Sequence, residues 1–256
     1  MSMKEQVTAI VQARMGSSRL PGKILKPVLG RPLIAYEIER LKRCTSLREI
    51  VLATSDLPSD DPVAALGAEL GVQVFRGNES DVLDRYTQAA RAFDARYVMR
   101  VTGDCPLIEP AICDRTVASF FQAQADYITT PPQVAEGLDC EVFTRAALET
   151  AWQEARRPSE REHVTLFIRN HPDRFTCLTT PHETDDGAYR ITVDEPGDLA
   201  VITAILKALV PLHGLAFTFF HVRDFLDAHP EIRALNSDIV RNEGLIKSLR
   251  QEDATS

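Results

Sequence analysis

Residues 7–23 read Val7-Thr8-Ala9-Ile10-Val11-Gln12-Ala13-Arg14-Met15-Gly16-Ser17-Ser18-Arg19-Leu20-Pro21-Gly22-Lys23. The first part, Val7–Val11, is an apolar run rich in β-branched residues, which predicts a buried strand. The loop that follows carries two glycines, two serines, two arginines and a lysine. Its glycines let the backbone approach a ligand closely, and exposed amides together with Arg14, Arg19 and Lys23 can face phosphate oxygens. We therefore predict a strand that leads into a polyanion-binding loop.

This loop differs from the two best-known phosphate motifs. In the P-loop, four residues separate two glycines, and a lysine and then a serine or threonine follow. Here five residues separate Gly16 from Gly22, and Ile24 follows Lys23, so the hydroxyl that would hold magnesium is missing. The dinucleotide pattern Gly-x-Gly-x-x-Gly is also absent. An ordinary strand-to-helix loop with a solvated basic cluster is the alternative. Three cations within ten residues of a chain with net charge -8 favour the phosphate interpretation.

The composition is typical of a globular protein with a sizeable core. The chain has 256 residues, of which 44% are hydrophobic, and this length suits one large α/β domain or a domain with an appended lobe. A net charge of -8 argues against nucleic acid as a partner, since such binders usually carry a basic excess. We expect no membrane span, because no apolar run approaches ~20 residues. The polar start, Met1–Gln6, lacks a signal-peptide core.

The cysteines and histidines are scattered. The five cysteines are Cys44, Cys105, Cys113, Cys140 and Cys177. An odd number without a Cys-x-x-Cys pair fits reduced thiols in the cytoplasm better than a disulfide framework or a zinc site. Cys105 is interpreted as a small buried thiol rather than a nucleophile. The six histidines show no ligand-like pairing.

The first half of the chain alternates predicted strands and helices. Strands are expected at 49–54, 72–75 and 97–102, and helices at 32–41, from Asp60 or Asp61 to about Gly71, and at 81–93. This alternation predicts a doubly wound, mostly parallel sheet. Ligands gather outside the carboxyl ends of the strands in such sheets. The loops at 14–23, 54–56, 76–80 and 103–106 should therefore lie at one edge.

The middle of the chain has a different character. After a helix at 111–124, extended pieces are expected at 126–130 and 138–143, a helix at 145–156, and strands at 175–180 and 189–193. Ser159 and Glu162 have capping-box spacing. We interpret residues of about 126–188 as an antiparallel lobe inserted into a domain that spans 1–220. The main sheet resumes at 190–194, a helix follows at 196–209, and residues 221–256 form a helical tail.

Two aspartates and several polar clusters could carry chemistry. Asp104 and Asp194 each follow a predicted strand, and Mg²⁺ commonly binds one or two carboxylates plus substrate phosphates. Each could instead cap the next helix, an alternative that is serious for Asp194. Arg76, at a strand exit, could contact a nucleotide or simply be exposed. Two further clusters could bind a substrate or face solvent; they comprise Arg161, Glu162 and His163, and Glu136, Asp139 and Glu141.

The chain resembles the cytidylyltransferase superfamily that makes CMP-activated acidic sugars, such as acylneuraminate and 3-deoxy-manno-octulosonate cytidylyltransferases. The likeness is greatest to the spore coat polysaccharide branch. It covers roughly residues 7–210 in five blocks of matching order and spacing. The blocks are 12–23, 75–86 (Phe75-Arg76-Gly77 and Asp81-Val82-Leu83-Asp84-Arg85-Tyr86), 100–106 (Arg100-Val101-Thr102-Gly103-Asp104-Cys105-Pro106), 161–165 (Arg161-Glu162-His163-Val164-Thr165) and 192–199 (Thr192-Val193-Asp194-Glu195-Pro196-Gly197-Asp198-Leu199).

The resemblance implies a nucleotide-diphospho-sugar transferase fold, often dimeric through the inserted lobe. It implies that Asp104 and Asp194 bind Mg²⁺, that Arg14 and Lys23 contact the nucleotide phosphates, and that Arg14, Lys23 and Asp104 are catalytic. The full set of nucleotide-binding candidates is Ala13, Arg14, Gly16, Ser17, Arg19, Lys23, Arg76, Thr102 and Gly103.

We expect transfer of CMP from CTP to a sugar hydroxyl with release of pyrophosphate, for surface polysaccharide or glycan biosynthesis. The expected partners are a nucleoside triphosphate and a small sugar. Two alternatives stay open at this point. The enzyme could use GTP or another nucleotide, because the base contacts are not evident in the sequence. The chain could also be a catalytically silent nucleotide-sugar binding or regulatory protein, although the basic loop and both aspartates argue against it.

Overall fold

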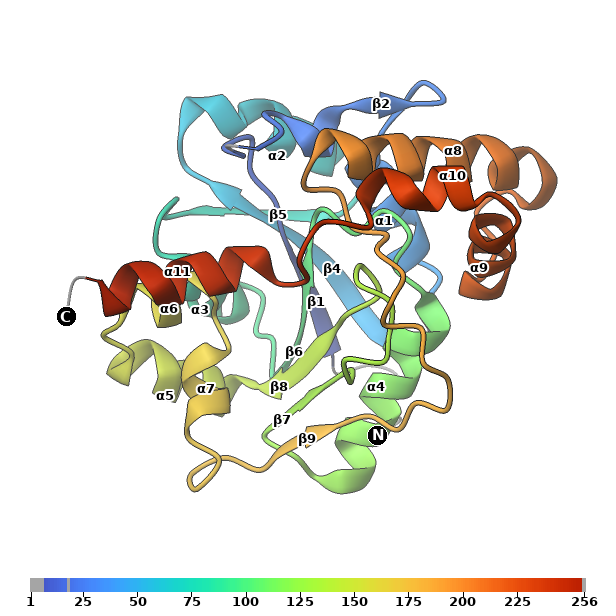
Figure 1. The fold of residues 1–256 in the computed structure, drawn as a ribbon. Coiled ribbons are helices and arrows are strands. Elements are labelled where there is room, and N and C mark those ends of the chain that lie inside the picture. Colours follow the sequence, from blue (N-terminus) through green and yellow to red (C-terminus); the bar gives the residue numbers. More distant parts are fainter. Residues whose placement is uncertain (1–6, 18, 255–256) are drawn as a thin grey trace.

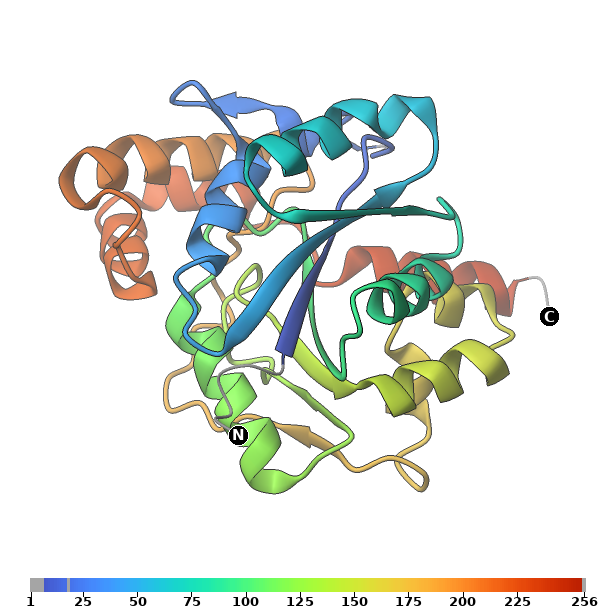
Figure 2. The same cartoon turned by 180° about the vertical axis from the view of Figure 1, so that it is seen from behind.

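The computed structural model describes residues 7–17 and 19–254, so Met1–Gln6, Ser18 and Thr255–Ser256 lie outside it. A twisted sheet runs through the molecule with helices on both sides (Figure 1, Figure 2). Its seven strands have the order β5-β4-β1-β6-β8-β7-β9. The strands are β1 (Val7–Gln12), β4 (Leu47–Ser55), β5 (Gln73–Gly77), β6 (Tyr97–Thr102), β7 (Tyr127–Thr129), β8 (Glu141–Thr144) and β9 (Cys177–Thr179). A separate small ribbon pairs β2 (Pro27–Val28) with β3 (Arg31–Pro32) in antiparallel fashion.

Helices connect most of these strands. In chain order they are α1 (Leu33–Leu41), α2 (Asp61–Glu69), α3 (Val82–Ala92), α4 (Pro110–Ala123), α5 (Arg145–Glu154), α6 (Pro158–Glu162), α7 (Leu166–Asn170), α8 (Pro196–His213), α9 (Phe219–Ala228), α10 (Pro230–Arg233) and α11 (Glu243–Asp253). Short 3₁₀ turns lie at Lys23–Leu25, Pro58–Asp60 and Ala234–Asn236.

The strand directions confirm the predicted fold class. β1 lies at the centre and pairs in parallel with β4 on one side and β6 on the other. β4 also pairs in parallel with β5, so the first four strands of the sheet form one parallel block. β8 is antiparallel to both β6 and β7, while β9 is parallel to β7. The sheet is therefore mostly parallel, with an antiparallel addition.

Successive residues of the strands enter two separate cores. In β1, Ala9 and Val11 pack into one core with α1, α2, α4 and α8. Ile10 packs into the other with α3, α5 and α7. Side chains of a strand alternate between its two faces, and both faces of this sheet are covered. This explains why Val7–Val11 is almost entirely apolar and is fully buried, Thr8 included.

The middle of the chain extends the sheet rather than adding a separate one. The predicted extended pieces at 126–130, 138–143 and 175–180 become β7, β8 and β9, which belong to the seven-stranded sheet. The predicted strand at 189–193 is wrong, since only one isolated bridge, between Glu136 and Arg190, forms there. Tyr189, Ile191 and Val193 are buried, but the backbone of this stretch bonds to loop residues Glu136 and Asp104.

Two further details differ from expectation. Ser159 lies inside α6, and the side chain of Glu160, not Glu162, accepts a bond from the Arg157 amide, 3.4 Å away. The expectation that no apolar run approaches the length of a membrane span fails for α8. This helix has 18 residues and a mean hydropathy of 1.3, which passes that test by length and composition alone. Its buried residues, such as Val201 and Ile205, pack into the protein core, as expected for a core helix.

Candidate active site

The loop after β1 is fixed by its neighbours at the carboxyl edge of the sheet. The amide of Gly103, just past β6, donates to the Gln12 carbonyl oxygen at 2.8 Å. A methyl group on Gly103 would lie 2.9 Å from the Ala13 Cβ, so only glycine allows this approach. Asp60 accepts from the Met15 amide at 2.7 Å and from Ser55. Asp60 is the N-cap residue of α2, but its side chain makes no capping bond and instead holds the basic loop.

Lys23 lies between the two predicted metal ligands. Its Nζ is 2.7 Å from Asp104 Oδ2 and 2.8 Å from Asp194 Oδ1. Residues that are 171 positions apart in sequence therefore meet at one point. Lys23 is buried, with 9% of its surface exposed, because the 3₁₀ turn at Lys23–Leu25 directs it inward. The structure thus places three of the predicted site residues in direct contact.

The charges of this cluster support one another. Burial alone would raise the pKa of Asp104, but the ammonium of Lys23 lowers it to about 2. Burial would likewise lower the pKa of Lys23, but the two carboxylates outweigh it and raise that pKa above its usual value. Glu37 lies fully buried nearby, accepts from the Cys105 amide at 3.2 Å, and burial raises its pKa well above the ordinary value. Burial also raises the pKa of the Cys105 thiol, as expected for an inert thiol.

Backbone bonds bring Asp194 to Asp104. The Val193 amide donates to the Asp104 carbonyl oxygen at 2.8 Å. Asp194 does not cap α8, because the N-cap residue is Glu195. The Asp198 carboxylate accepts from the amides of Asp194 and Glu195 at 2.9 and 3.0 Å. The Asp194 side chain is therefore free to accept from Lys23, and Arg190 contacts its Oδ2 at 3.2 Å.

Arg19 connects the basic loop to the C-terminal part of the chain. Its Nη2 lies 2.9 Å from Asp194 Oδ1, and its Nη1 lies 2.8 Å from Glu243 Oε2 and 3.7 Å from Glu195 Oε1. Glu243 begins α11. We refer to residues 241–253 as the C-terminal segment; its helix α11 lies in front, beside α6, in Figure 1.

The other loop candidates lie around the same edge. Arg14 donates to the Glu79 carbonyl oxygen at 3.1 Å. The Ser17 hydroxyl accepts from the Leu20 amide at 3.3 Å and so shapes the loop itself. Arg76 bonds to Asp61 and to the carbonyl oxygens of Ser55 and Leu57, and within the described residues it makes no hydrogen bond or ion pair with Lys23 or the two aspartates. Arg85 lies in the quoted block 75–86 but was not among the candidate site residues; it is 1% exposed and also donates to the Glu79 carbonyl oxygen at 3.2 Å.

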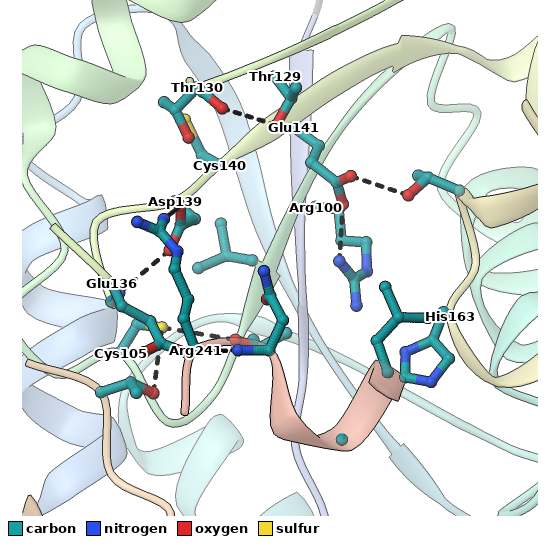
Figure 3. Close-up of a pocket in the computed structure, with 18 of the residues that line it drawn as sticks. Arg100, Cys105, Thr129, Thr130, Glu136, Asp139, Cys140, Glu141, His163 and Arg241 are labelled. Carbon is teal, nitrogen blue, oxygen red and sulfur yellow. Dashed lines mark hydrogen bonds and ion pairs between the residues drawn. The ribbon is translucent and has the colours of Figure 1, made fainter. Parts of the chain in front are cut away.

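A cavity of about 810 Å³ adjoins the carboxylate pair, and Figure 3 shows part of its lining. Glu141 faces Arg100 there, with Arg100 Nη1 2.6 Å from Glu141 Oε2. The hydroxyls of Tyr127 and Thr165 also donate to Glu141. Burial would raise the pKa of Glu141, but Arg100 and these hydrogen bonds lower it. The side chain is therefore a fully engaged anion.

On the other side of the cavity, the C-terminal segment contacts the loop that carries Glu136 and Asp139. Figure 3 shows Arg241 extending toward Asp139 and Glu136. Its guanidinium is 2.5 Å from Asp139 Oδ1 and donates to the carbonyl oxygens of Pro132 and Val134. Burial raises the pKa of Asp139 to about 6, although Arg241 acts in the opposite direction. Glu136 accepts from Arg190 at 2.6 Å.

The residues of the predicted cluster Arg161-Glu162-His163 lie in two different places: Arg161 lies against neighbouring helices, and His163 lies at the cavity. Arg161 bonds to Asp81 and to the Trp152 carbonyl oxygen, so it joins α6 to α3 and α5 and does not line the cavity. His163 does line the cavity, and its Nε2 lies 3.0 Å from the Ser248 hydroxyl. That hydroxyl also donates to Glu162 at 2.8 Å. Burial lowers the pKa of His163, which favours its neutral form.

Sequence reasoning missed four charged residues of the cavity, which are Arg100, Arg169, Arg241 and Glu243. Arg100 lies in the matching block 100–106, within strand β6. A strand that is covered on both faces is normally apolar. A charged residue in such a strand therefore indicates a functional role or a buried partner. Arg241 and Glu243 follow no motif, because they reach the site only through the tertiary fold.

Comparison with known proteins shows a clear family. The family model described as "Cytidylyltransferase" matches residues 8–200. The spore coat polysaccharide biosynthesis protein SpsF of Bacillus subtilis is 35% identical over 77% of this chain and 85% of its own length. A 3-deoxy-manno-octulosonate cytidylyltransferase of Anaeromyxobacter dehalogenans is 30% identical over 79% of this chain and 98% of its own. A solved cytidylyltransferase from Leptospira borgpetersenii superposes with a TM-score of 0.84 at 32% identity, covering 93% of this chain and all of that one.

Proposed function

This chain belongs to the cytidylyltransferase family, and on that premise we propose that it transfers CMP from CTP to an acidic sugar and releases pyrophosphate. One observation carries the proposal. Lys23 and Arg19 of the basic loop converge on Asp104 and Asp194 at the carboxyl edge of the sheet, next to a cavity of about 810 Å³. That volume is within the range of small-molecule sites.

The carboxylate pair suits a hard divalent cation such as Mg²⁺. Asp104 Oδ2 and Asp194 Oδ1 lie within 2.8 Å of one atom, the Nζ of Lys23, so two oxygen donors already point at one position. Among the described residues no group of three or more His, Cys, Asp or Glu side chains could hold a metal. Mg²⁺ is usually bound by one or two carboxylates, and substrate phosphates and water fill its remaining coordination positions. When bound, the ion would neutralise charge on the phosphates.

The side chains of the loop supply the remaining positive charge. The acceptor hydroxyl attacks the α-phosphorus of CTP, and pyrophosphate departs from the opposite side. Arg14, Arg19 and Lys23 bind the phosphates and counter the negative charge that grows on the leaving pyrophosphate. Thr102 and Gly103, at the end of β6 beside β1, approach the ribose. Alignment of the hydroxyl with the phosphorus supplies much of the rest of the acceleration.

An uncompensated cation in the cavity supports an acidic acceptor. Arg169 lines the cavity, is exposed, and its side chain makes no hydrogen bond or ion pair within 7–17 and 19–254. By contrast, the cavity carboxylates already have cationic partners, as Glu141 has Arg100 and Asp139 has Arg241. The nearby Arg100 also has a buried Nε without a partner. A sugar carboxylate would satisfy these donors.

A pyrophosphate-release assay tests the function. The four nucleoside triphosphates are each paired with 3-deoxy-manno-octulosonate, an acylneuraminate and a neutral hexose, with and without Mg²⁺. We expect release with CTP, an acidic sugar and Mg²⁺. Selective pyrophosphate release with GTP would show that the enzyme uses GTP instead of CTP, within the same class of reaction. No release from any pair would favour a silent nucleotide-sugar binding protein.

Single substitutions test the roles of the loop and the carboxylates. Lys23→Ala and Asp104→Ala should each lower the rate by about 10²–10³, the usual loss when one charge contact to a developing anion is removed. Lys26→Ala is the matched control, because Lys26 is three residues away and forms no ion pair among the described residues. Turnover of either variant at the rate of the unaltered enzyme would refute the assignment.

We also propose a homodimer that forms through residues 126–188. Strand β9 lies at one edge of the sheet, and Leu178 on it is 41% exposed. An exposed apolar residue on an edge strand favours pairing with another chain. Light scattering coupled to size exclusion should give twice the monomer mass of 28.5 kDa. The monomer mass at all concentrations would exclude this dimer.

A further inference from the structure

The position best suited to a metal ion is taken by a side chain of the protein itself. The ammonium of Lys23 lies within 2.8 Å of one oxygen of Asp104 and one of Asp194. Among the described residues these two carboxylates are its only ion-pair partners. The side chain is 11% exposed, so little water can replace a lost partner.

Two further cations share Asp194. Arg19 Nη2 contacts the same oxygen as Lys23, at 2.9 Å, and Arg190 Nη2 contacts the other oxygen at 3.2 Å. Arg190 is itself fixed by Asp198 and Glu136, with contacts of 2.8 and 2.6 Å, so it cannot swing away easily. Three cations therefore contact the carboxylate pair: Lys23, Arg19 and Arg190.

These contacts affect a free divalent cation and a nucleotide complex in opposite ways. A free dication would have to expel Lys23 from its two carboxylates and leave a buried ammonium without a partner, which is strongly unfavourable. It would also face Arg19 and Arg190. A metal ion on a polyphosphate brings anionic oxygens that can receive both Lys23 and Arg19. Lys23 then exchanges one set of oxygens for another.

We infer that Lys23, assisted by Arg19, makes the Asp104–Asp194 pair selective for a metal ion that arrives on a polyphosphate over the free ion. This inference rests on the proposed function, since it concerns the same carboxylates and loop. Lys23 thus determines which form of the cation the site accepts, in addition to contacting phosphate.

Manganese binding without nucleotide tests the inference. Free Mn²⁺ is counted by electron paramagnetic resonance during titration of the unaltered protein, Lys23→Met, Arg19→Gln and the control Lys26→Met. We expect weak binding to the unaltered protein and to Lys26→Met. Lys23→Met should bind at least about tenfold more tightly, because it removes a unit charge next to the incoming dication. Arg19→Gln should show a smaller increase, because Lys23 still bridges the carboxylates.

A second measurement uses the unaltered protein and does not depend on whether Lys23→Met folds. The ¹⁵N resonance of the Lys23 ammonium is assigned by comparison with Lys23→Arg. Mg²⁺ alone should leave it unchanged, whereas CTP without metal should shift it. A shift with Mg²⁺ alone, or equally tight Mn²⁺ binding by the unaltered protein and folded Lys23→Met, would overturn the inference. Either result could occur with pyrophosphate release intact, while loss of the proposed function would appear as no release from any substrate pair.

Discussion

At the scale of single residues, Asp104 depends on partners from distant parts of the chain. Its backbone carbonyl oxygen accepts from Val193 at 2.8 Å, and its side chain contacts Lys23 at 2.7 Å. About a fifth of the side chain is exposed, at 21%. Asp104 is thus held through its backbone by Val193 and through its carboxylate by Lys23, and it still lines the cavity.

The charge of Asp104 should appear in the acid stability of the protein. Its pKa falls from a usual 3.8 to about 2 on folding. A carboxyl group whose pKa is lowered by folding stabilises the folded state at every pH above its pKa in the unfolded chain. This stabilisation is lost as the pH falls from 4 toward 2. Solvent screens part of the interaction, so we expect a contribution of ~1–2 kcal/mol.

Urea unfolding between pH 2 and 6 measures this contribution. The difference in unfolding free energy between the unaltered protein and Asp104→Asn should shrink as the pH falls through 4 to 2. Asp56→Asn is the control, since Asp56 is exposed and forms no ion pair in the described part of the chain. A difference that stays constant over this range would contradict the assigned pKa.

Gly103 is a second residue whose identity the site requires. A Cβ there would lie 2.9 Å from the Ala13 Cβ and 3.0 Å from the Gln12 carbonyl oxygen, so Gly103→Ala must push β6 and the basic loop apart. We expect a loss of ~1–3 kcal/mol in stability, the usual cost of overpacking, together with slower pyrophosphate release.

Gly244→Ala provides the opposite case. A Cβ at Gly244 would have no atom within 4 Å, and this residue lies within α11. Alanine should therefore be neutral or stabilise the protein by ~0.5–1 kcal/mol. Thermal unfolding of both variants measures the contrast, and equal stabilities would show that the close approach at Gly103 is unimportant.

At the scale of elements, the C-terminal segment is anchored by polar contacts. None of its residues is buried. Its anchors are Arg241 on Asp139, Glu243 on Arg19, Ser248 on His163, and Glu252 on Ser159, the last with a Ser159 hydroxyl contact of 2.8 Å. Three of these four anchors end on residues that line the cavity. The C-terminal segment is therefore a wall of the cavity without a hydrophobic core of its own.

Removing one anchor should loosen this wall. Arg241→Ala abolishes the ion pair with Asp139 and two bonds to backbone carbonyl oxygens. Trypsin cleavage after Lys247 and Arg250, both in α11, should become several-fold faster, because a helix without buried residues opens locally at little cost in free energy. Arg233→Ala is the control, as Arg233 pairs with Asp227 outside the segment. Unchanged cleavage rates would show that other contacts fix the segment.

Element by element, the sequence predicts regular strands and helices well and irregular stretches poorly. β6 was predicted as 97–102 and occupies Tyr97–Thr102. The stretch 189–193 has a strand-like pattern, but its backbone bonds to loop residues rather than to a strand, which the pattern does not reveal. The same limit applies to α11, since a polar amphipathic helix does not indicate where it docks.

At the scale of the whole molecule, Arg40 joins the helical C-terminal part to the sheet domain. It is 1% exposed and lies on α1. Its Nε donates to the Ile108 carbonyl oxygen at 2.7 Å, and its Nη1 donates to those of Leu215 and Phe217 at 3.1 Å each. Glu109 lies 3.2 Å from Nη2, and burial lowers the pKa of Arg40 to about 10 despite this carboxylate.

Loss of Arg40 should destabilise the whole protein. Arg40→Met leaves Glu109 as a buried charge without its partner, and such changes cost ~3–5 kcal/mol. The double variant Arg40→Met/Glu109→Gln should lose less, because the unpaired charge is gone. Arg43→Met, on the exposed side nearby, should stay within ~0.5 kcal/mol. Urea unfolding measures all three, and a small effect of Arg40→Met would show that this link is dispensable.

For the molecule as a whole, the alternating pattern predicts the fold class but not the order β5-β4-β1-β6-β8-β7-β9. The site follows the same division. Lys23 was predicted because it belongs to the basic loop, and Asp104 and Asp194 were predicted because each follows an apolar strand-like run. The roles of Arg169 and the C-terminal segment were not, because only tertiary packing brings them to the cavity.

The wide sequence separation inside the site also has a consequence for synthesis. β5, β4, β1 and β6 all lie within the first 102 residues and form one parallel block. The ribosome therefore completes the basic loop and its sheet early, whereas Asp194 is translated 171 residues after Lys23, and Glu243 is translated 224 residues after Arg19. A nascent chain carries the cationic loop without these two counterions until Asp194 and Glu243 have been translated in turn. The loop becomes a finished site only when both of these distant carboxylates have been made.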